Sequence, residues 1–397
     1  MQYSHHEPTR RATVNVDLIE DEDDLASLIP AWDELAAAAG LPSATSGWMH
    51  GYWRHLRPNG AQLRVVVVSE RGRVVAIAPY FASPPEGPRT DYRLLGSGTT
   101  AGISPLATPS REWAAAGPIA RTLAGARPRP NLVTFEGLPL ASPWPALLRE
   151  HWPGAIRPTA WRPSIMGSPV VNLAYDSFDV WMASKSSNFR SQMRRMRRQL
   201  ERAGGRIRTS SAETLEADIA AMLRLHEERW RDRGASGVTP VADRLARLFA
   251  EIGRDGDERR ALRLEIQVVE VEGEPISVQA FVIAGRTVGY WNGGWDERFA
   301  KLKPAMLGIL AAIESAFERG DYCVSLGAGT QPYKMRFADG VEPVTWGHLI
   351  VPNARAPVTI AQLAPRALTT VAKRLALRGL TREQQERLKS LRHRVRR

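Results

Sequence analysis

Residues 262–337 read LRLEIQVVEVEGEPISVQAFVIAGRTVGYWNGGWDERFAKLKPAMLGILAAIESAFERGDYCVSLGAGTQPYKMRF, and this stretch decides the fold. Three apolar runs separated by turn residues predict three antiparallel strands. A polar loop, WDERFAKLK, then leads to a helix that begins at Pro304, and a short strand follows. This order is typical of a mixed α/β core with a crevice at the loop. The loop meets a helix N-terminus, where free N–H groups and the helix dipole favour phosphate.

The composition indicates a two-domain globular protein. The chain has 397 residues, of which 43% are apolar, enough for two hydrophobic cores. Its longest apolar runs reach about half of the ~20 residues that a membrane-spanning helix needs. The N-terminus lacks a hydrophobic signal segment. The single cysteine, Cys323, excludes an internal disulfide and lies in an apolar run, which favours a small buried side chain. We therefore expect a cytoplasmic protein without an integral membrane segment.

Positive charge is concentrated at the C-terminus. The net charge is +12, and the residues from Lys373 onward contribute +8, since ten Lys/Arg face only Glu383 and Glu386. Residues 356–397 predict a basic, helical tail. Such a tail could dock on the protein, on RNA such as tRNA, or on an anionic membrane surface, where the protein would be peripheral. A solvated tail is the alternative.

The first half of the chain also shows strand and turn signals. Leu63–Ser69 and Val74–Phe81 predict a hairpin with a turn at Glu70–Arg73. Gly96, Gly98 and Ala101 satisfy a bare G-x-G-x-x-A pattern, but prolines interrupt the residues that would have to form the following helix. An irregular turn that lines a cleft is therefore the better interpretation than a dinucleotide site.

Several segments together resemble one known family. They are GGWDERF (293–299), the proline-opened helix KPAMLGILAAIESAFERG (303–320), VSLGAGTQPYKMRF (324–337), the arginine-rich FRSQMRRMRRQLERAGG (189–205) and LHEERW (225–230). Their order and spacing resemble the CelD/BioF-type, acetyltransferase-like branch of the GNAT superfamily, which is related to the Fem-type peptidoglycan aminoacyltransferases. The resemblance covers most of residues 172–351, with a looser echo in the first half.

The resemblance implies an α/β (α+β) fold with two tandem GNAT-like domains, each a mixed, largely antiparallel sheet flanked by helices. The N-terminal domain would span residues 1–165 and the C-terminal acyltransferase domain residues 166–355, before the tail 356–397. Members of such a family transfer an acyl group directly to an amine, so no serine or cysteine nucleophile is needed.

The resemblance also assigns residues to the acyl donor. The strand that holds Tyr290 and Trp291 would lie along the pantetheine arm of acetyl-CoA or another acyl-CoA. The loop from Lys301 to Leu307, with Gly308 after it, would approach the pyrophosphate, and Lys301 and Lys303 would add positive charge. Superfamily members usually carry a glycine-rich loop here, whereas this chain has KLKPAMLG, in which Pro304 offers no N–H.

Three side chains are candidates for catalysis. Lys334, in YKMRF, would stabilise negative charge on the donor or on the tetrahedral intermediate, with a surface lysine at a strand edge as the alternative. Asp296 follows a glycine pair in a loop and is either a functional carboxylate or the cap of a turn. Tyr333 is either the general acid for the leaving group or a packed ring. Gln279 would form part of the wall of the site.

The arginine-rich helix and the helix after it supply candidate substrate-binding residues. An apolar stripe of Phe189, Met193, Met196 and Leu200 predicts the buried face of the first helix, with Ser187 or Asn188 as its N-cap. The arginines around the stripe suggest a grip on phosphates or carboxylates, with a solvated face as the alternative. We assign Arg190, Arg194, Arg197, His226, Arg229 and Trp230 to this group. His226 falls near a buried stripe and has a satisfied core histidine as its alternative.

The leading hypothesis is an N-acyltransferase that moves an acyl, in the first place an acetyl, group from acyl-CoA to an amino sugar, an amino acid or a peptide. The first alternative is Fem-type transfer of an aminoacyl group from charged tRNA, and the second is a non-catalytic GNAT-like binding module. Sequence patterns of serine hydrolases, P-loop enzymes and zinc sites do not occur, so no metal is expected.

Overall fold

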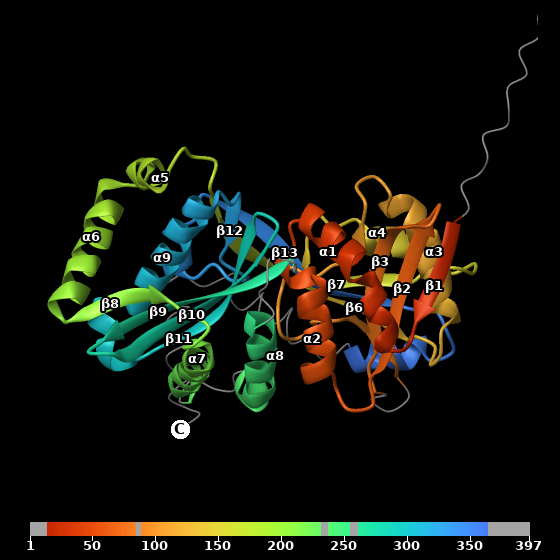
Figure 1. The fold of residues 1–397 in the computed structure, drawn as a ribbon. Coiled ribbons are helices and arrows are strands. Elements are labelled where there is room, and N and C mark those ends of the chain that lie inside the picture. Colours follow the sequence, from red (N-terminus) through yellow and green to blue (C-terminus); the bar gives the residue numbers. More distant parts are fainter. Residues whose placement is uncertain (1–13, 85–88, 232–236, 255–260, 364–397) are drawn as a thin grey trace, which may run out of the picture.

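The computed structural model describes residues 14–84, 89–231, 237–254 and 261–363 (Figure 1). Within these ranges the strands form one mixed sheet of 13 strands, most of them antiparallel to their neighbours. The predicted α/β fold with a mixed, largely antiparallel sheet flanked by helices is confirmed. None of the described helices is long and apolar enough to cross a membrane. The tail predicted at 356–397 is helical over 356–363, and its basic residues from Lys373 onward lie outside the described ranges.

The two halves of the chain repeat one order of elements. Each has a strand, two helices, three antiparallel strands, a helix, a strand parallel to the last one, a short helix and a long strand. The first half consists of β1 (Val14–Ile19), α1 (Ile29–Ala38), α2 (Ser46–Leu56), β2 (Gln62–Glu70), β3 (Arg73–Ala82), β4 (Asp91–Leu94), β5 (Leu106–Ala107, paired with β3), α3 (Glu112–Gly125), β6 (Leu132–Pro139), α4 (Trp144–His151) and β7 (Thr159–Asn172).

The second half begins after β7 with two helices, α5 (Phe178–Ser184) and α6 (Ser187–Arg202). The repeated order then follows as β8 (Gly205–Thr209), α7 (Leu215–Trp230), α8 (Ala242–Arg254), β9 (Leu262–Val271), β10 (Glu274–Ala284), β11 (Thr287–Trp295), α9 (Pro304–Arg319), β12 (Cys323–Ser325), α10 (Pro332–Met335) and β13 (Gly340–Ile350). A 3₁₀ turn, η4 (Glu297–Leu302), joins β11 to α9.

Both halves also use the same hairpin turn. Arg71 and Gly72 connect β2 to β3 with φ of 52° and 78°, and Glu272 and Gly273 connect β9 to β10 with φ of 53° and 84°. Two consecutive residues with positive φ make a turn whose twist matches that of the flanking strands. The predicted hairpins at these positions are therefore confirmed.

The last strands of the two halves are exchanged. The strand order is β1-β2-β3-β4-β6-β13-β7-β12-β11-β10-β9-β8. The final strand of the first half, β7, pairs with β12 of the second half, and the final strand of the second half, β13, pairs with β6 of the first half and with β7. The proposed domain boundary at residues 165/166 lies within β7, which crosses from one half to the other (Figure 1).

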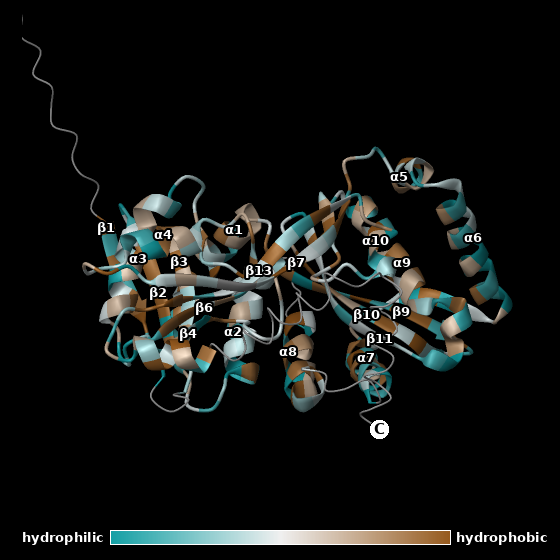
Figure 2. Cartoon of the chain, turned by 180° about the vertical axis from the view of Figure 1, so that it is seen from behind, coloured by the Kyte–Doolittle hydropathy of each residue, from teal (hydrophilic) through white to brown (hydrophobic). Residues whose placement is uncertain are grey.

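Buried side chains form two large clusters. One joins α1 and α2 to α7 and α8 of the second half, so that the ring centroids of Trp48 and Phe249 lie 6.0 Å apart. The other packs α5, α6 and α9 on the second half of the sheet. In α6 the predicted stripe of Phe189, Met193, Met196 and Leu200 is buried, and hydrophilic colour predominates on the rest of that helix (Figure 2). The N-cap is Ser186 and not Ser187 or Asn188 as predicted, because the Ser186 hydroxyl accepts the Phe189 N–H at 3.2 Å.

Candidate functional site

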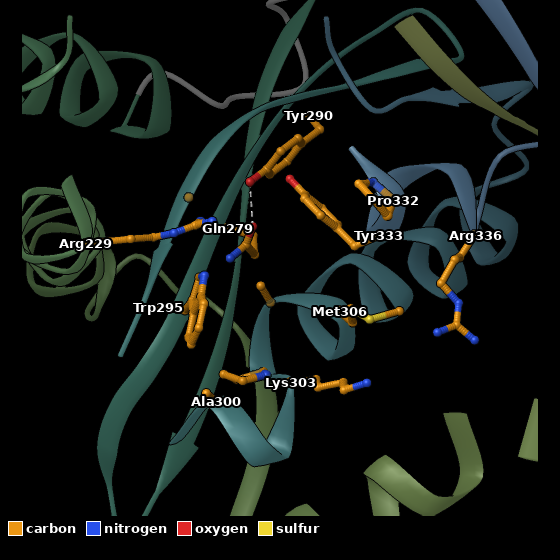
Figure 3. A pocket seen from close by; sticks show the side chains of 13 residues that line it. Arg229, Gln279, Tyr290, Trp295, Ala300, Lys303, Met306, Pro332, Tyr333 and Arg336 are labelled. Carbon is orange, nitrogen blue, oxygen red and sulfur yellow. Dashed lines mark hydrogen bonds between the residues drawn. The ribbon is translucent and has the colours of Figure 1, made fainter. Parts of the chain in front are cut away.

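A pocket of about 340 Å³ lies where β11 separates from β12. These parallel strands pair only from Thr287 to Gly289, opposite Cys323–Ser325, so β11 continues beyond its partner. The pocket fills the resulting opening between β11, the start of α9 and α10 (Figure 3). Its lining consists of Arg229, Gln279, Tyr290, Gly293, Trp295, Ala300, Lys303, Pro304, Ala305, Met306, Pro332, Tyr333 and Arg336. Of the predicted site residues, it brings together Arg229, Gln279, Tyr290, Lys303 and Tyr333.

A chain of hydrogen bonds fixes the inner wall of this pocket. The Tyr290 hydroxyl donates to Gln279 Oε1 at 2.7 Å, and Gln279 Nε2 donates to Ser277 Oγ at 2.9 Å. Ser277 Oγ in turn donates to the Gly294 carbonyl oxygen at 3.1 Å. Ser277 and Gln279 are buried on β10. Because each donor has an acceptor, the orientation of the Gln279 amide is defined, and the phenol of Tyr290 is held in place.

Two tyrosines face each other at this wall. Figure 3 shows the phenol oxygens of Tyr290 and Tyr333 pointing toward one another, one from β11 and the other from α10. Burial raises the pKa of Tyr290 well above its ordinary value, and burial also raises the pKa of Tyr333, although the charge of Arg229 opposes this. Both phenols are therefore protonated at neutral pH, and either can donate a proton.

Lys334 is buried beside Tyr290. Its side chain is 5% exposed, and Nζ donates to the carbonyl oxygens of Ala328 at 3.2 Å and Gly327 at 3.4 Å. The ammonium also lies 5.6 Å from the centre of the Tyr290 ring. Burial lowers the pKa of Lys334 to about 8. The surface position that we considered as the alternative is wrong, because Lys334 belongs to α10 and not to an exposed strand edge.

Arg229 brings a positive charge to the pocket from α7. Its guanidinium lies 5.3 Å from the centre of the Trp295 ring, and Figure 3 shows the side chain reaching toward the middle of the pocket. Its Nε is buried without a hydrogen-bond partner among the described groups. His226, one turn earlier, is buried behind the pocket, donates from Nδ1 to the Gly293 carbonyl oxygen at 3.3 Å, and has its pKa lowered by burial. Trp230 is 38% exposed at the end of α7 and does not line the pocket.

The turn before α9 offers few free N–H groups. Lys303 precedes the helix with a left-handed φ of 51° and lines the pocket, whereas Lys301 is exposed on η4. Pro304 has no N–H, and the Met306 N–H donates to the Lys303 carbonyl oxygen at 3.0 Å. An anion at this helix end would therefore depend on side chains more than in a glycine-rich loop.

Two predicted donor-binding residues of α9 have packing roles. Leu307 is fully buried in the second core cluster. At Gly308, a Cβ would lie 3.0 Å from Gln279 Cγ, so the absence of a side chain lets the helix approach the wall of the pocket. Neither residue is among those that line the pocket.

Asp296 caps a turn outside the pocket. Its Oδ1 accepts the Arg298 N–H at 2.9 Å, and its carboxylate pairs with the Arg298 guanidinium at 2.6 Å. The hydrogen bond from Arg298 is the largest cause that lowers the pKa of Asp296. This geometry is that of a turn cap, the alternative role that we considered for Asp296. Asp296 does not line the first pocket, so its catalytic role stays a prediction.

The arginines of α6 lie outside the pocket. Arg190 Nη1 donates to the Ala183 carbonyl oxygen at 2.9 Å, and Arg197 pairs with Glu314 of α9 at 2.5 Å. Arg194 is exposed. The start of α6 nevertheless reaches the rim of the pocket, because the guanidinium of Arg336 lies 5.9 Å from the centre of the Phe189 ring.

A second pocket of about 410 Å³ lies between the two halves. It receives residues from β11, β12, β13 and β7 and from the turn at Gly98–Gly102, which was predicted to line a cleft. Trp291 is part of this second pocket and not of the first, and its Nε1 donates to the Thr99 carbonyl oxygen at 3.0 Å. Tyr290 lines both pockets.

Of the 13 described residues that line the first pocket, eight were not assigned to the site from the sequence, and neither was Ser277, which supports the wall. Trp295 lies in GGWDERF and Arg336 lies in YKMRF. Both segments carry the family resemblance, so these two residues could have been predicted from it. Met306 lies in the loop that was expected to approach the pyrophosphate, but neither Met306 nor Pro332 was singled out, since apolar residues in such places usually fill a core. Ser277 supports Gln279 and is two residues away on the same strand face. Within the described ranges, no group of His, Cys, Asp and Glu side chains is placed to hold a metal ion.

Comparison with known proteins places this site in a family. Residues 187–335 match the model of the acetyltransferase (GNAT) domain. No curated protein matches the sequence. The structure of FemX is similar, with a TM-score of 0.53 and 12% identity over 77% of this chain and 91% of that one. The C-terminal domain (DUF2156) of a putative lysylphosphatidylglycerol synthetase from Agrobacterium fabrum gives 0.51 and 10%, over 85% and 96%.

Identities this low show a shared fold and carry no information about the substrate. The family match covers the element order from α6 to α10, and the first half repeats the order of the second. The predicted tandem of GNAT-like halves is therefore confirmed. The chain carries, at residues 187–335, an N-acyltransferase domain of the GNAT superfamily.

Proposed function

We propose that this protein transfers an acyl group, in the first place an acetyl group, from a CoA thioester to an amine acceptor. The observation that carries the proposal is the pocket at the point where β11 leaves β12, with cations at its rim and polar groups at its inner wall. Arg229, Lys303 and Arg336 are the only charged residues among those that line it, so the pocket suits an anionic donor.

The inner wall, together with the buried Lys334 beside Tyr290, supplies groups for the charges that the reaction develops. The amine nitrogen attacks the thioester carbonyl, an N–C bond forms, and the C–S bond breaks as the thiolate leaves. Lys334, with a pKa of about 8, is mainly protonated at neutral pH and can stabilise the oxyanion. Tyr333 is protonated and can give its proton to the leaving thiolate. The acceptor ammonium first loses one proton to solvent, so that the neutral amine attacks. The proton that the nitrogen loses after the attack goes to the Tyr333 phenolate, which restores the phenol.

A second candidate is transfer of an aminoacyl group from charged tRNA. Two observations favour it over an ordinary CoA enzyme. First, the start of α9 has fewer free N–H groups than a glycine-rich loop would offer. Second, α6 begins beside the rim of the pocket and carries exposed arginines such as Arg194. Neutralisation of phosphates by such arginines is the usual source of affinity for RNA.

Thermal unfolding in the presence of each donor separates the two candidates. Acetyl-CoA and longer acyl-CoAs should raise the Tm if the donor is a CoA thioester, whereas stabilisation by charged but not by uncharged tRNA selects the aminoacyl route. Mass detection of an acylated amine then tests turnover. If neither donor shifts the Tm and no acylated product forms, the proposed transfer is wrong.

A further inference from the structure

The second pocket differs in chemistry from the first. Among the described residues that line it, Glu342, which is exposed on β13, is the only charged one, and it forms no ion pair with a described basic side chain. The described residues that line the first pocket, in contrast, include three cations and no carboxylate. The charges are thus separated across β11, with positive groups on the side of the donor and a negative group on the side of the second pocket. A phosphate-bearing ligand would meet no positive side chain in the second pocket.

The polar groups of this second pocket are mainly hydroxyls. Ser43 and Thr100 come from the first half, with their hydroxyl oxygens 3.0 Å apart, and Ser168 and Ser325 lie opposite each other on β7 and β12 at 3.3 Å. Hydroxyl groups can donate and accept at once, so each can also bind a hydroxyl group of a ligand. The indole of Trp346 adds an aromatic wall of the kind on which the apolar face of a sugar ring packs.

The two pockets meet at the groups that we assign to catalysis. Tyr290 lines both of them. Lys334 Nζ donates hydrogen bonds to the carbonyl oxygens of Gly327 and Ala328, and these two residues line the second pocket. An amine that enters from the second pocket would therefore reach a donor carbonyl at the junction beside Tyr290 and Lys334.

We propose that the second pocket holds the acceptor, and that the acceptor is a small hydroxylated amine without phosphate, of which amino sugars are the model. Glu342 attracts its ammonium group, and the hydroxyls of both halves bind its hydroxyl groups. The inference rests on the proposed acyl transfer, because it names the acceptor class for the same reaction. It also gives the first half a function, since that half supplies one wall of the acceptor site.

The single cysteine of the chain provides a direct test. Cys323 lines the second pocket and is partly exposed. Glu342 lines the same pocket. Burial, and to a smaller extent the charge of Glu342, raise the pKa of the Cys323 thiol. Alkylation of the full-length protein by iodoacetamide at pH 8.5, followed by mass spectrometry, therefore reports whether this pocket is open or filled.

We expect glucosamine at four times its Kd to slow the alkylation of Cys323 about fivefold, because only the unoccupied fraction reacts. Glucose, which lacks the ammonium, and glucosamine 6-phosphate, whose phosphate would meet no basic side chain among the described residues of this pocket, should protect more weakly. Glu342→Gln should raise the Kd for glucosamine about fivefold and leave the affinity for the acyl donor unchanged. Glu274→Gln, an exposed glutamate on β10 outside the second pocket, is the matched control.

Any one of three results would overturn the inference. The first is a Cys323 that does not react with iodoacetamide in the free protein. The second is protection of Cys323 by glucosamine 6-phosphate that equals or exceeds the protection by glucosamine. The third is a Kd for glucosamine that is the same in Glu342→Gln as in the wild type. Acyl transfer to amines that do not protect Cys323 would refute the acceptor site alone and leave the proposed function intact. Protection by glucosamine without any shift by an acyl or aminoacyl donor would refute the proposed function and leave the binding site.

Discussion

Replacement of Lys334 by methionine should make the protein more stable and nearly inactive. The ammonium is 5% exposed, and in the described part of the chain it has carbonyl oxygens and an aromatic ring as neighbours but no carboxylate partner. A fall in the pKa from 10.5 to about 8 means that the folded state holds this charge at a cost of about 3 kcal/mol at pH 7. Loss of the hydrogen bonds to Gly327 and Ala328 would offset roughly 1–2 kcal/mol of that gain.

We therefore expect the free energy of unfolding of Lys334→Met at pH 7 to exceed that of the wild type by about 1–2 kcal/mol. Urea denaturation followed by tryptophan fluorescence measures it. Lys303→Met is the matched control, because Lys303 is exposed and its replacement should change the stability by less than about 0.5 kcal/mol. Turnover of Lys334→Met should fall by a factor of about 100 or more, since removal of one group that stabilises an oxyanion costs that much.

The pH dependence of the free energy of unfolding is an independent test of whether the buried charge on Lys334 destabilises the folded protein. Between pH 8 and 9.5 the unfolded chain still holds the proton on Lys334 and the folded protein releases it, so the stability of the wild type should rise with pH, by up to about 1.4 kcal/mol per pH unit. In Lys334→Met this contribution should be absent. The raised pKa of the Cys323 thiol acts in the opposite direction, but it is common to both proteins and leaves the difference between them unchanged. Measurements stop at pH 9.5, because the raised pKa values of Tyr290 and Tyr333 act in the opposite direction above pH 10. A variant that is less stable than the wild type, or one that keeps the rise, would refute the reasoning.

Three further substitutions test the site and its supports. Tyr290→Phe leaves Gln279 Oε1 without its donor and should cost about 1–3 kcal/mol in urea denaturation, whereas Tyr322→Phe on the surface should cost almost nothing; equal costs would contradict the hydrogen-bonded wall. Gly294→Ala should cost about 2–3 kcal/mol, because its Cβ would lie 2.4 Å from the backbone nitrogen of His226, while Gly125→Ala meets nothing within 4 Å and serves as the control; a neutral Gly294→Ala would show that α7 does not lie this close to β11. Arg194→Glu should weaken the binding of charged tRNA roughly fivefold at low salt and leave the binding of acetyl-CoA unchanged; tRNA binding at wild-type strength would remove α6 from the donor surface.

The local elements of the second half were predictable because their patterns are strong. The stripe on α6, the start of α9 at Pro304 and the hairpin at Glu272 and Gly273 follow from periodicity and from turn residues, and the structure confirms all three. The site was predictable only in part. Gln279, Tyr290, Tyr333 and Lys334 come together because the strands and α10 bring them there, and that required the family resemblance in addition to the pattern.

Other features depend on long-range pairing, which no local pattern specifies. The sequence pattern does not distinguish the arginines of α6 from one another, yet Arg197 forms an ion pair with Glu314 and Arg194 is exposed to solvent. Trp291 was placed with the donor, but it lines the second pocket and packs against the first core cluster, whereas Tyr290 packs against the second cluster. The register of β11 shifts here, because Trp291 is the extra residue of a β-bulge. The crossing of β7 and β13 between the halves likewise follows from the tertiary fold and left no mark in the sequence.

This crossing has a mechanical consequence. Lobes joined by a single linker can swing apart to admit a ligand, but here the ladder along β13 is bonded to β6 on one side and to β7 on the other. Opening the molecule like a jaw would break rows of backbone hydrogen bonds in the middle of a continuous sheet. The paired backbone therefore limits how far the two halves can move apart. A ligand of the second pocket would enter through movements of the side chains and loops around its opening, and the fixed spacing of the strands would limit the size of the ligand.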